Sequence, residues 1–138
     1  MPTLTRWFVK TAMIYLALSL LLGMGVAYNP LSGSGGFTGL FPVYLHLLVF
    51  GWLTQLIFGV AYWMFPKYAR GPARGSETLG WMTYLLFNIG LLMRAAGELV
   101  QQRPPQSIWA WMLVVSALLQ WLAVMLFIIN IWPRVRGK

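Results

Sequence analysis

The sequence has no cysteine, a single histidine and only two acidic residues among its 138 positions. Without cysteine, the chain cannot form disulfide bonds, thiolate metal sites or a cysteine nucleophile. Charged residues of both signs make up 9% of the chain, against about a quarter in an average soluble domain. The sequence also offers no convincing nucleophile, quinone site or proton path, so an enzyme with bond-making chemistry of its own is not expected.

Apolar residues dominate instead, at 59% of the chain, and the mean hydropathy is +0.71. A helix needs about 20 apolar residues to cross the roughly 30 Å hydrocarbon layer of a membrane. Four stretches meet that requirement and use most of the chain: residues 8–28, 41–65, 79–99 and 108–132. The expected fold is therefore all-α, a bundle of four transmembrane helices in a single domain that covers residues 1–138.

The basic residues are distributed unevenly between the two sides of such a bundle. The net charge is +8, and eight of the ten basic residues lie before or at the start of the first span, between the second and the third, or after the fourth. These three regions share one side, whereas the two opposite loops contain only Arg103. The positive-inside rule therefore places both termini in the cytoplasm, as in a multi-pass protein of a prokaryotic inner membrane. The distribution indicates topology and contact with anionic lipid rather than nucleic-acid binding.

The single histidine, His46, lies inside the second span. An imidazole in hydrocarbon is costly unless it is paired, hydrated or coordinated, which makes His46 a candidate functional residue. The second span begins at the outer side, so a rise of 1.5 Å per residue puts His46 about 6 Å below the outer boundary. Similar depths are expected for one arginine and three methionines of the other spans: Arg94, Met24, Met93 and Met112.

This layer of side chains has the chemistry of a haem site. Imidazole and thioether groups are axial ligands of b- and c-type haems, and arginine pairs with haem propionates. We therefore expect His46 to ligate haem iron, with Met112 as an alternative axial ligand. Arg94 and Arg103 are expected to bind the propionates. The simpler alternatives are methionines that fill packing gaps and an i, i+4 ion pair between Arg94 and Glu98.

Helical phase divides the second span into two faces. At 100° per residue, small and polar residues share one face, which suits close packing against another helix in lipid: Gly51, Gln55, Gly59 and Tyr62. His46 falls on the opposite, apolar face, which we expect a cofactor, a second subunit or both to cover. That apolar face also carries Phe50, Leu53, Ile57 and Met64.

The same span resembles a helix of a known family. Its segments YLHLLVFGW (residues 44–52) and IFGVAYWMFP (residues 57–66) are similar to the second transmembrane helix of the catalytic subunits of haem–copper oxidases and nitric oxide reductases. In that family, this helix carries a histidine that ligates the low-spin haem near the outer side, followed by a glycine-rich aromatic stretch that ends at a proline. The resemblance implies that His46 is the haem axial ligand and that Phe50 and Trp52, in the same motif, contact the cofactor. The other three spans resemble the family only in general character.

The departures from the family are as informative as the match. Its catalytic subunits need further histidines for the second low-spin ligand, the high-spin haem and the adjacent metal. This chain has no other histidine, so reduction of oxygen or nitric oxide at a binuclear centre is excluded for the chain alone. Three sources of the sixth haem ligand remain open: His46 of a second copy in a symmetric homodimer, Met112 or another methionine of the layer, or none. The apolar face that carries His46 favours the homodimer, with the haem between two His46 rings.

The sequence thus predicts a membrane protein that binds b-type haem near its outer surface and serves in electron transfer or in redox or gas sensing. A homodimer or higher oligomer is expected, together with a redox partner or a larger respiratory complex. Two alternatives remain. In the first alternative, the chain is a haem-free accessory or scaffold subunit of a larger respiratory or photosynthetic complex. In the second, the layer of histidine and methionine side chains binds Cu(I).

Overall fold

The computed structural model describes residues 1–28, 39–65, 75–100 and 107–135. Every regular element in these ranges is a helix: α1 (Thr3–Tyr28), α2 (Leu40–His46), η1 (Leu47–Thr54), α3 (Gln55–Met64), α4 (Glu77–Val100) and α5 (Ser107–Val135). Because α2, η1 and α3 follow one another without a break, the described ranges contain four helices long and apolar enough to cross a membrane. The predicted all-α fold and multi-pass membrane character are therefore confirmed. The first span begins at Thr3 rather than near residue 8, and the last continues through Pro133 to Val135.

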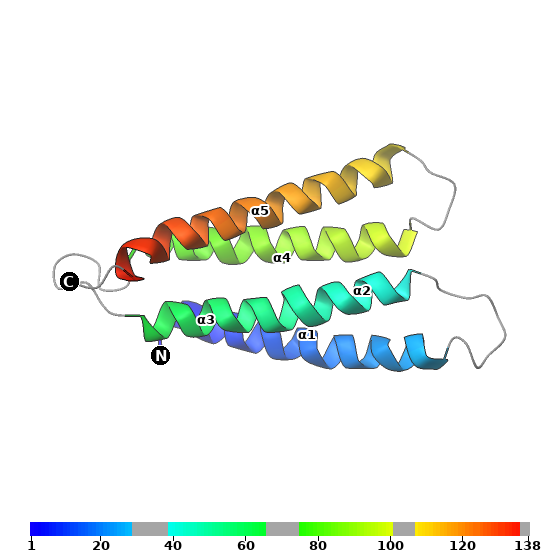
Figure 1. Cartoon of the computed structure of the whole chain (residues 1–138), viewed down its shortest axis with the longest axis horizontal. Coiled ribbons are helices and arrows are strands. Elements are labelled where there is room, and N and C mark those ends of the chain that lie inside the picture. The colour runs from blue at the N-terminus through cyan, green and yellow to red at the C-terminus, as the bar shows by residue number, and fades with distance from the viewer. Residues whose placement is uncertain (29–38, 66–74, 101–106, 136–138) are drawn as a thin grey trace.

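The four spans form two helix pairs (Figure 1). α1 packs along the continuous helix of α2, η1 and α3, and α4 packs along α5. α4 also contacts α2 and η1, which joins the two pairs. The N-terminal end of α1 and the C-terminal end of α5 lie at the same end of the bundle; the opposite end is called the far end below.

Glycines in the second span allow the first pair to pack closely. A Cβ atom added to Gly51 would lie 2.8 Å from Cγ of Tyr15 on α1, and one added to Gly59 would lie 2.7 Å from Cβ of Phe8. The whole predicted packing face is buried: Gly51, Gln55, Gly59 and Tyr62. The prediction that this face packs inside the bundle is confirmed.

We expect the Gly59→Ala variant to lower the free energy of unfolding by about 1–3 kcal/mol, the usual cost of overpacking a filled core. The new methyl group would press on Phe8, which is buried among its neighbours. Gly25→Ala is the matched control, because its Cβ would lie 3.6 Å from the nearest atom, an ordinary contact. Unfolding with sodium dodecyl sulfate in mixed micelles measures both variants. Equal stability of the two variants would contradict the packing described here.

Side chains of α5 also contact the second span near the end that carries the termini. Nη2 of Arg134 on α5 donates hydrogen bonds to the carbonyl oxygens of Tyr62 (3.2 Å) and Phe65 (2.6 Å), which lie at the end of α3. Further along, the rings of Phe58 on α3 and Phe127 on α5 stack with centroids 3.9 Å apart. Towards the far end, α5 diverges from α2 (Figure 1). The candidate site is the groove that opens where α2 and α5 move apart.

The π-helical segment η1 changes the direction in which side chains of the second span point. Its hydrogen bonds reach five residues back and its turns are wider than those of an α-helix. Thr54 Oγ1 likewise donates to the carbonyl oxygen five residues earlier, at 2.9 Å. Leu53 and Ile57 are exposed on the bundle surface, whereas Phe50 packs against both hydrophobic clusters of the interior. The helical projection at 100° per residue placed Phe50, Leu53 and Ile57 on one face with His46. That prediction is wrong for this part of the span, because Phe50 points inward while Leu53 and Ile57 are exposed.

Candidate functional site

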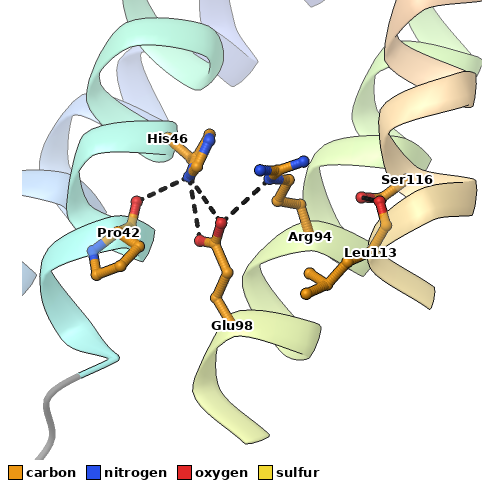
Figure 2. A network of polar contacts seen from close by, with 6 residues as sticks. All are labelled: Pro42, His46, Arg94, Glu98, Leu113 and Ser116. Atoms are coloured by element: carbon orange, nitrogen blue, oxygen red, sulfur yellow. Dashed lines mark hydrogen bonds and ion pairs between the residues drawn. The ribbon is translucent and has the colours of Figure 1, made fainter. Parts of the chain in front are cut away.

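A groove opens between the diverging helices near the far end of the bundle. Its volume is about 310 Å³, and we call it the α2–α5 groove. α2 and η1 form one wall, α5 forms the other and α4 lies between them, as Figure 2 shows for part of the site. The lining residues are His46, Phe50, Arg94, Ala117, Gln120, Trp121 and Val124. Because Trp121 is 58% exposed, the groove opens onto the surface of the bundle that faces lipid.

One ring nitrogen of His46 is held by two oxygen acceptors. Nδ1 lies 2.9 Å from the carbonyl oxygen of Pro42 and 3.0 and 3.1 Å from the two carboxylate oxygens of Glu98 (Figure 2). A carbonyl and a carboxylate only accept hydrogen bonds, so Nδ1 carries the proton and donates it. In the neutral ring, Nε2 then bears the lone pair. Among the residues that the structure describes, Nε2 has no hydrogen-bond partner, and the His46 side chain is 22% exposed.

The position of His46 corrects the expectation that only a cofactor or a second subunit covers its face. The ring lines an intramolecular groove and is paired with Glu98 on α4. It also stacks on Phe50, one turn further along the chain, with ring centroids 5.8 Å apart and an angle of 28° between the planes. These contacts restrict the rotation of the imidazole and leave one of its nitrogens for a ligand.

Glu98 connects His46 to Arg94. Nε of Arg94 donates to Oε1 of Glu98 at 3.1 Å, which confirms the predicted i, i+4 pair. Glu98 is 7% exposed, and the carboxylate balances the guanidinium charge in this half-buried position. Arg94 lines the groove and uses Nε for this bond, so its two terminal nitrogens remain available for an anionic ligand.

The contact between Glu98 and His46 was not predicted from the sequence. The signal for it was present, because Glu98 is the only acidic residue at membrane depth and lies, like His46, near the outer end of its span. The local rule that pairs residues four positions apart assigned Glu98 to Arg94. A carboxylate has two oxygens with several acceptor sites, so the pair with Arg94 leaves room for the second partner.

The wall formed by α5 contributes two residues that were not predicted to belong to the site. Trp121 lies well inside its span, where an interfacial role does not explain it, and the groove accounts for its position. Gln120 is 8% exposed, and its Nε2 atom is buried without a hydrogen-bond partner among the described residues. Burying an unpaired donor of this kind costs about 1–3 kcal/mol.

Met112 and Trp52, two further candidates from the sequence, lie elsewhere than in the described lining of the groove. Met112 faces α4, where its Cε atom lies 3.6 Å from the position of a Cβ added to Gly97. Trp52 is half-buried, and neither it nor Met112 is among the described residues that line the groove. Arg103 lies outside the described residues. The roles of these three residues in binding a cofactor stay predictions.

A Cu(I) site receives no support from the groove. Thioether and thiolate ligands suit that ion, but the described lining contains neither methionine nor cysteine. The described parts of the chain also hold no cluster of three or more histidine, cysteine, aspartate or glutamate side chains. Among the described lining residues, Nε2 of His46 is the nitrogen with a lone pair available for a metal.

The groove presents the lone pair of Nε2 of His46 and the terminal nitrogens of Arg94 among mostly apolar side chains. A lone pair of this kind can coordinate a metal, and a guanidinium can bind an anion. A scan against protein-family models and searches of curated proteins and of solved structures found no match to this chain.

Proposed function

We propose that the protein binds a b-type haem in the α2–α5 groove, with Nε2 of His46 as the axial ligand. Its role is electron transfer or the sensing of redox state or of a gas. The haem supplies one-electron chemistry or a place for a diatomic ligand, and the chain supplies the axial nitrogen, the orientation and the electrostatic surroundings.

The hydrogen bonding of Nδ1 of His46 carries this proposal. Histidines that ligate metals almost always donate their other N–H to a carboxylate or a backbone carbonyl, which sets the tautomer and raises the basicity of the ligating nitrogen. His46 has both kinds of acceptor, Glu98 and the carbonyl of Pro42.

The rest of the groove fits the other parts of a haem. Phe50 and Trp121 offer aromatic surface, and the terminal nitrogens of Arg94 match a propionate. The volume of about 310 Å³ is at the low end of the range for ligand sites, about 300–1,000 Å³. It is smaller than a whole haem, so part of the macrocycle would extend beyond the groove. Lipid or a second copy of the chain would cover that part.

The proposed setting follows from the charge distribution along the chain. The basic residues of the loops indicate cytoplasmic termini in a prokaryotic inner membrane. The far end of the bundle, which contains the groove, is then the outer side. An electron donor or acceptor, or a larger respiratory complex, would approach the haem there.

The absorption spectrum and haem content of the purified full-length protein test the proposal. We expect a Soret band and a pyridine haemochrome typical of b-type haem. Because both walls of the groove come from one chain, we expect one haem per chain. One haem per two chains would instead indicate a haem shared between two His46 side chains. A colourless protein that remains colourless after titration with haemin would overturn the proposal and favour a haem-free accessory subunit.

A further inference from the structure

We propose that Arg6 and Lys10 on α1 bind the phosphate group of one anionic phospholipid, whose acyl chains lie along the apolar face of the same helix. This inference goes beyond the proposed haem function and does not depend on it. The N-terminal end of α1 lies at the end of the bundle opposite to the α2–α5 groove (Figure 1).

Arg6 and Lys10 are two exposed basic side chains without an anionic partner. They lie four positions apart, so they project from the same face of α1, one turn from each other. Among the residues that the structure describes, ion pairs are formed by Glu98 with His46 and Arg94, towards the far end. The side chains of Arg6 and Lys10 form neither an ion pair nor a hydrogen bond within the described ranges. Both cations are therefore available to a phosphate from outside the chain, the kind of anion that arginine and lysine bind in proteins.

Aromatic side chains place these two cations at the level of lipid headgroups. Trp7 lies between them in the sequence and is 51% exposed. Its ring centroid is 6.4 Å from that of Tyr84 on α4, and the ring of Tyr84 is 5.8 Å from that of Trp81. Tryptophan and tyrosine are enriched at the interface between membrane and water. A lysine one turn deeper extends its ammonium group back to that level, so Lys10 and Arg6 can reach one phosphate together.

Beyond the two cations, the same face of α1 is apolar. Spacings of three and four residues continue along it from Arg6 and Lys10, and its side chains are exposed: Met13, Ile14, Ala17, Leu20, Leu21 and Met24. A cationic end followed by an apolar face matches a phospholipid with its headgroup at the end that carries the termini. The two positive charges favour an anionic headgroup over a zwitterionic one, which brings a cation of its own. The apolar face favours a lipid over free phosphate.

Native mass spectrometry of the full-length protein in detergent tests this inference. The protein is titrated with phosphatidylglycerol and with phosphatidylcholine of the same acyl chains. We expect the first molecule of phosphatidylglycerol to bind about 25-fold more tightly, since each basic residue beside an anionic lipid contributes about fivefold. Arg6→Gln or Lys10→Gln alone should lower this preference about fivefold, and the double variant should abolish it.

The end of the chain provides a control of equal charge. Arg136 and Lys138 follow α5, whose C-terminal end lies at the same end of the bundle as the start of α1. The double variant Arg136→Gln, Lys138→Gln also removes two positive charges but should keep the preference for phosphatidylglycerol. Without lipid, Arg6→Gln and Lys10→Gln should unfold in sodium dodecyl sulfate like the wild type, because their side chains lose no partner among the described residues.

Three outcomes would overturn the inference. The first is equal affinity of the wild type for the two lipids. The second is the same loss of preference in both double variants, because the total charge and not this face of α1 would then select the lipid. The third is displacement of bound phosphatidylglycerol by millimolar inorganic phosphate, which would assign the two cations to free phosphate.

Discussion

We expect the His46→Ala variant to be purified as a folded membrane protein that lacks haem. His46 is the only histidine of the chain, and its Nε2 is the ligand that the groove offers. Loss of the proposed bond from Nε2 to iron should reduce haem content at least about tenfold, judging from the 10–100-fold that even loss of a supporting partner costs a metal site. The Soret absorbance per chain measures this loss.

Addition of free imidazole distinguishes a lost ligand from a damaged fold. In the His46→Ala variant, imidazole can enter the space left by the side chain and should restore the Soret band in haemin titrations. The fold itself should be preserved, because Glu98 keeps its pair with Arg94 in the absence of the ring. Normal haem content in His46→Ala would refute the assignment of His46 as axial ligand.

Two methionine variants serve as controls for the same measurement. Met24 is 64% exposed on α1, so Met24→Leu should keep the wild-type spectrum. Met112→Leu should also keep it if Met112 only packs against α4 near Gly97. A spectrum that changes in Met112→Leu but not in Met24→Leu would indicate Met112 as the second axial ligand.

The second large effect is expected at Glu98. Replacing it with leucine removes the acceptor that orients Nδ1 of His46 and leaves only the carbonyl of Pro42. Haem affinity should fall about 10–100-fold, the usual cost of losing such a partner. Glu98→Gln keeps one oxygen acceptor and removes the charge, so its affinity should fall less, while the reduction potential should rise because the imidazole becomes less basic. Haemin titration and a potentiometric titration measure the two effects.

The chain offers a matched control for Glu98, because its only other acidic residue is Glu77 on the same helix. Glu77 is exposed and lies in the first turn of α4, so Glu77→Gln should leave haem affinity and potential unchanged. Wild-type affinity in Glu98→Leu would show that the carboxylate does not support the ligand.

Glu98→Leu also leaves the guanidinium of Arg94 without its partner. The resulting loss of stability has to be separated from the loss of haem affinity. Removing one partner of the half-buried pair should lower the stability of the haem-free protein by about 1–3 kcal/mol, less than for a fully buried pair because Arg94 is 29% exposed. The double variant Arg94→Leu, Glu98→Leu should regain most of that stability without regaining haem affinity.

Much of the fold could be predicted from composition and periodicity. The four spans, the buried face with Gly51 and Gly59, and the pair of Arg94 with Glu98 are properties of one helix at a time. In lipid, every backbone polar group must be satisfied within its own helix. Hydropathy and spacing along a single segment are therefore sufficient to locate the spans and their small-residue faces.

The site was predictable only in part. His46 stands out in the sequence because an imidazole is rare and costly in an apolar helix. Trp121 and Gln120 do not stand out, because a tryptophan and a glutamine on a long helix have many possible neighbours. The uniform helical projection also failed after His46, since the π-helical turns of η1 separate Phe50 from Leu53 and Ile57.

The sequence by itself determined that this is a multi-pass helical membrane protein whose single histidine lies within a span. Its hydropathy and its one imidazole were sufficient for that, since both are properties of the chain rather than of its packing. Only the tertiary structure brought His46 to Glu98, 52 positions away, and opened a groove walled by α2 and α5. The physical reason is that contacts between helices depend on how the spans pack, tilt and diverge, and no single segment specifies these relations.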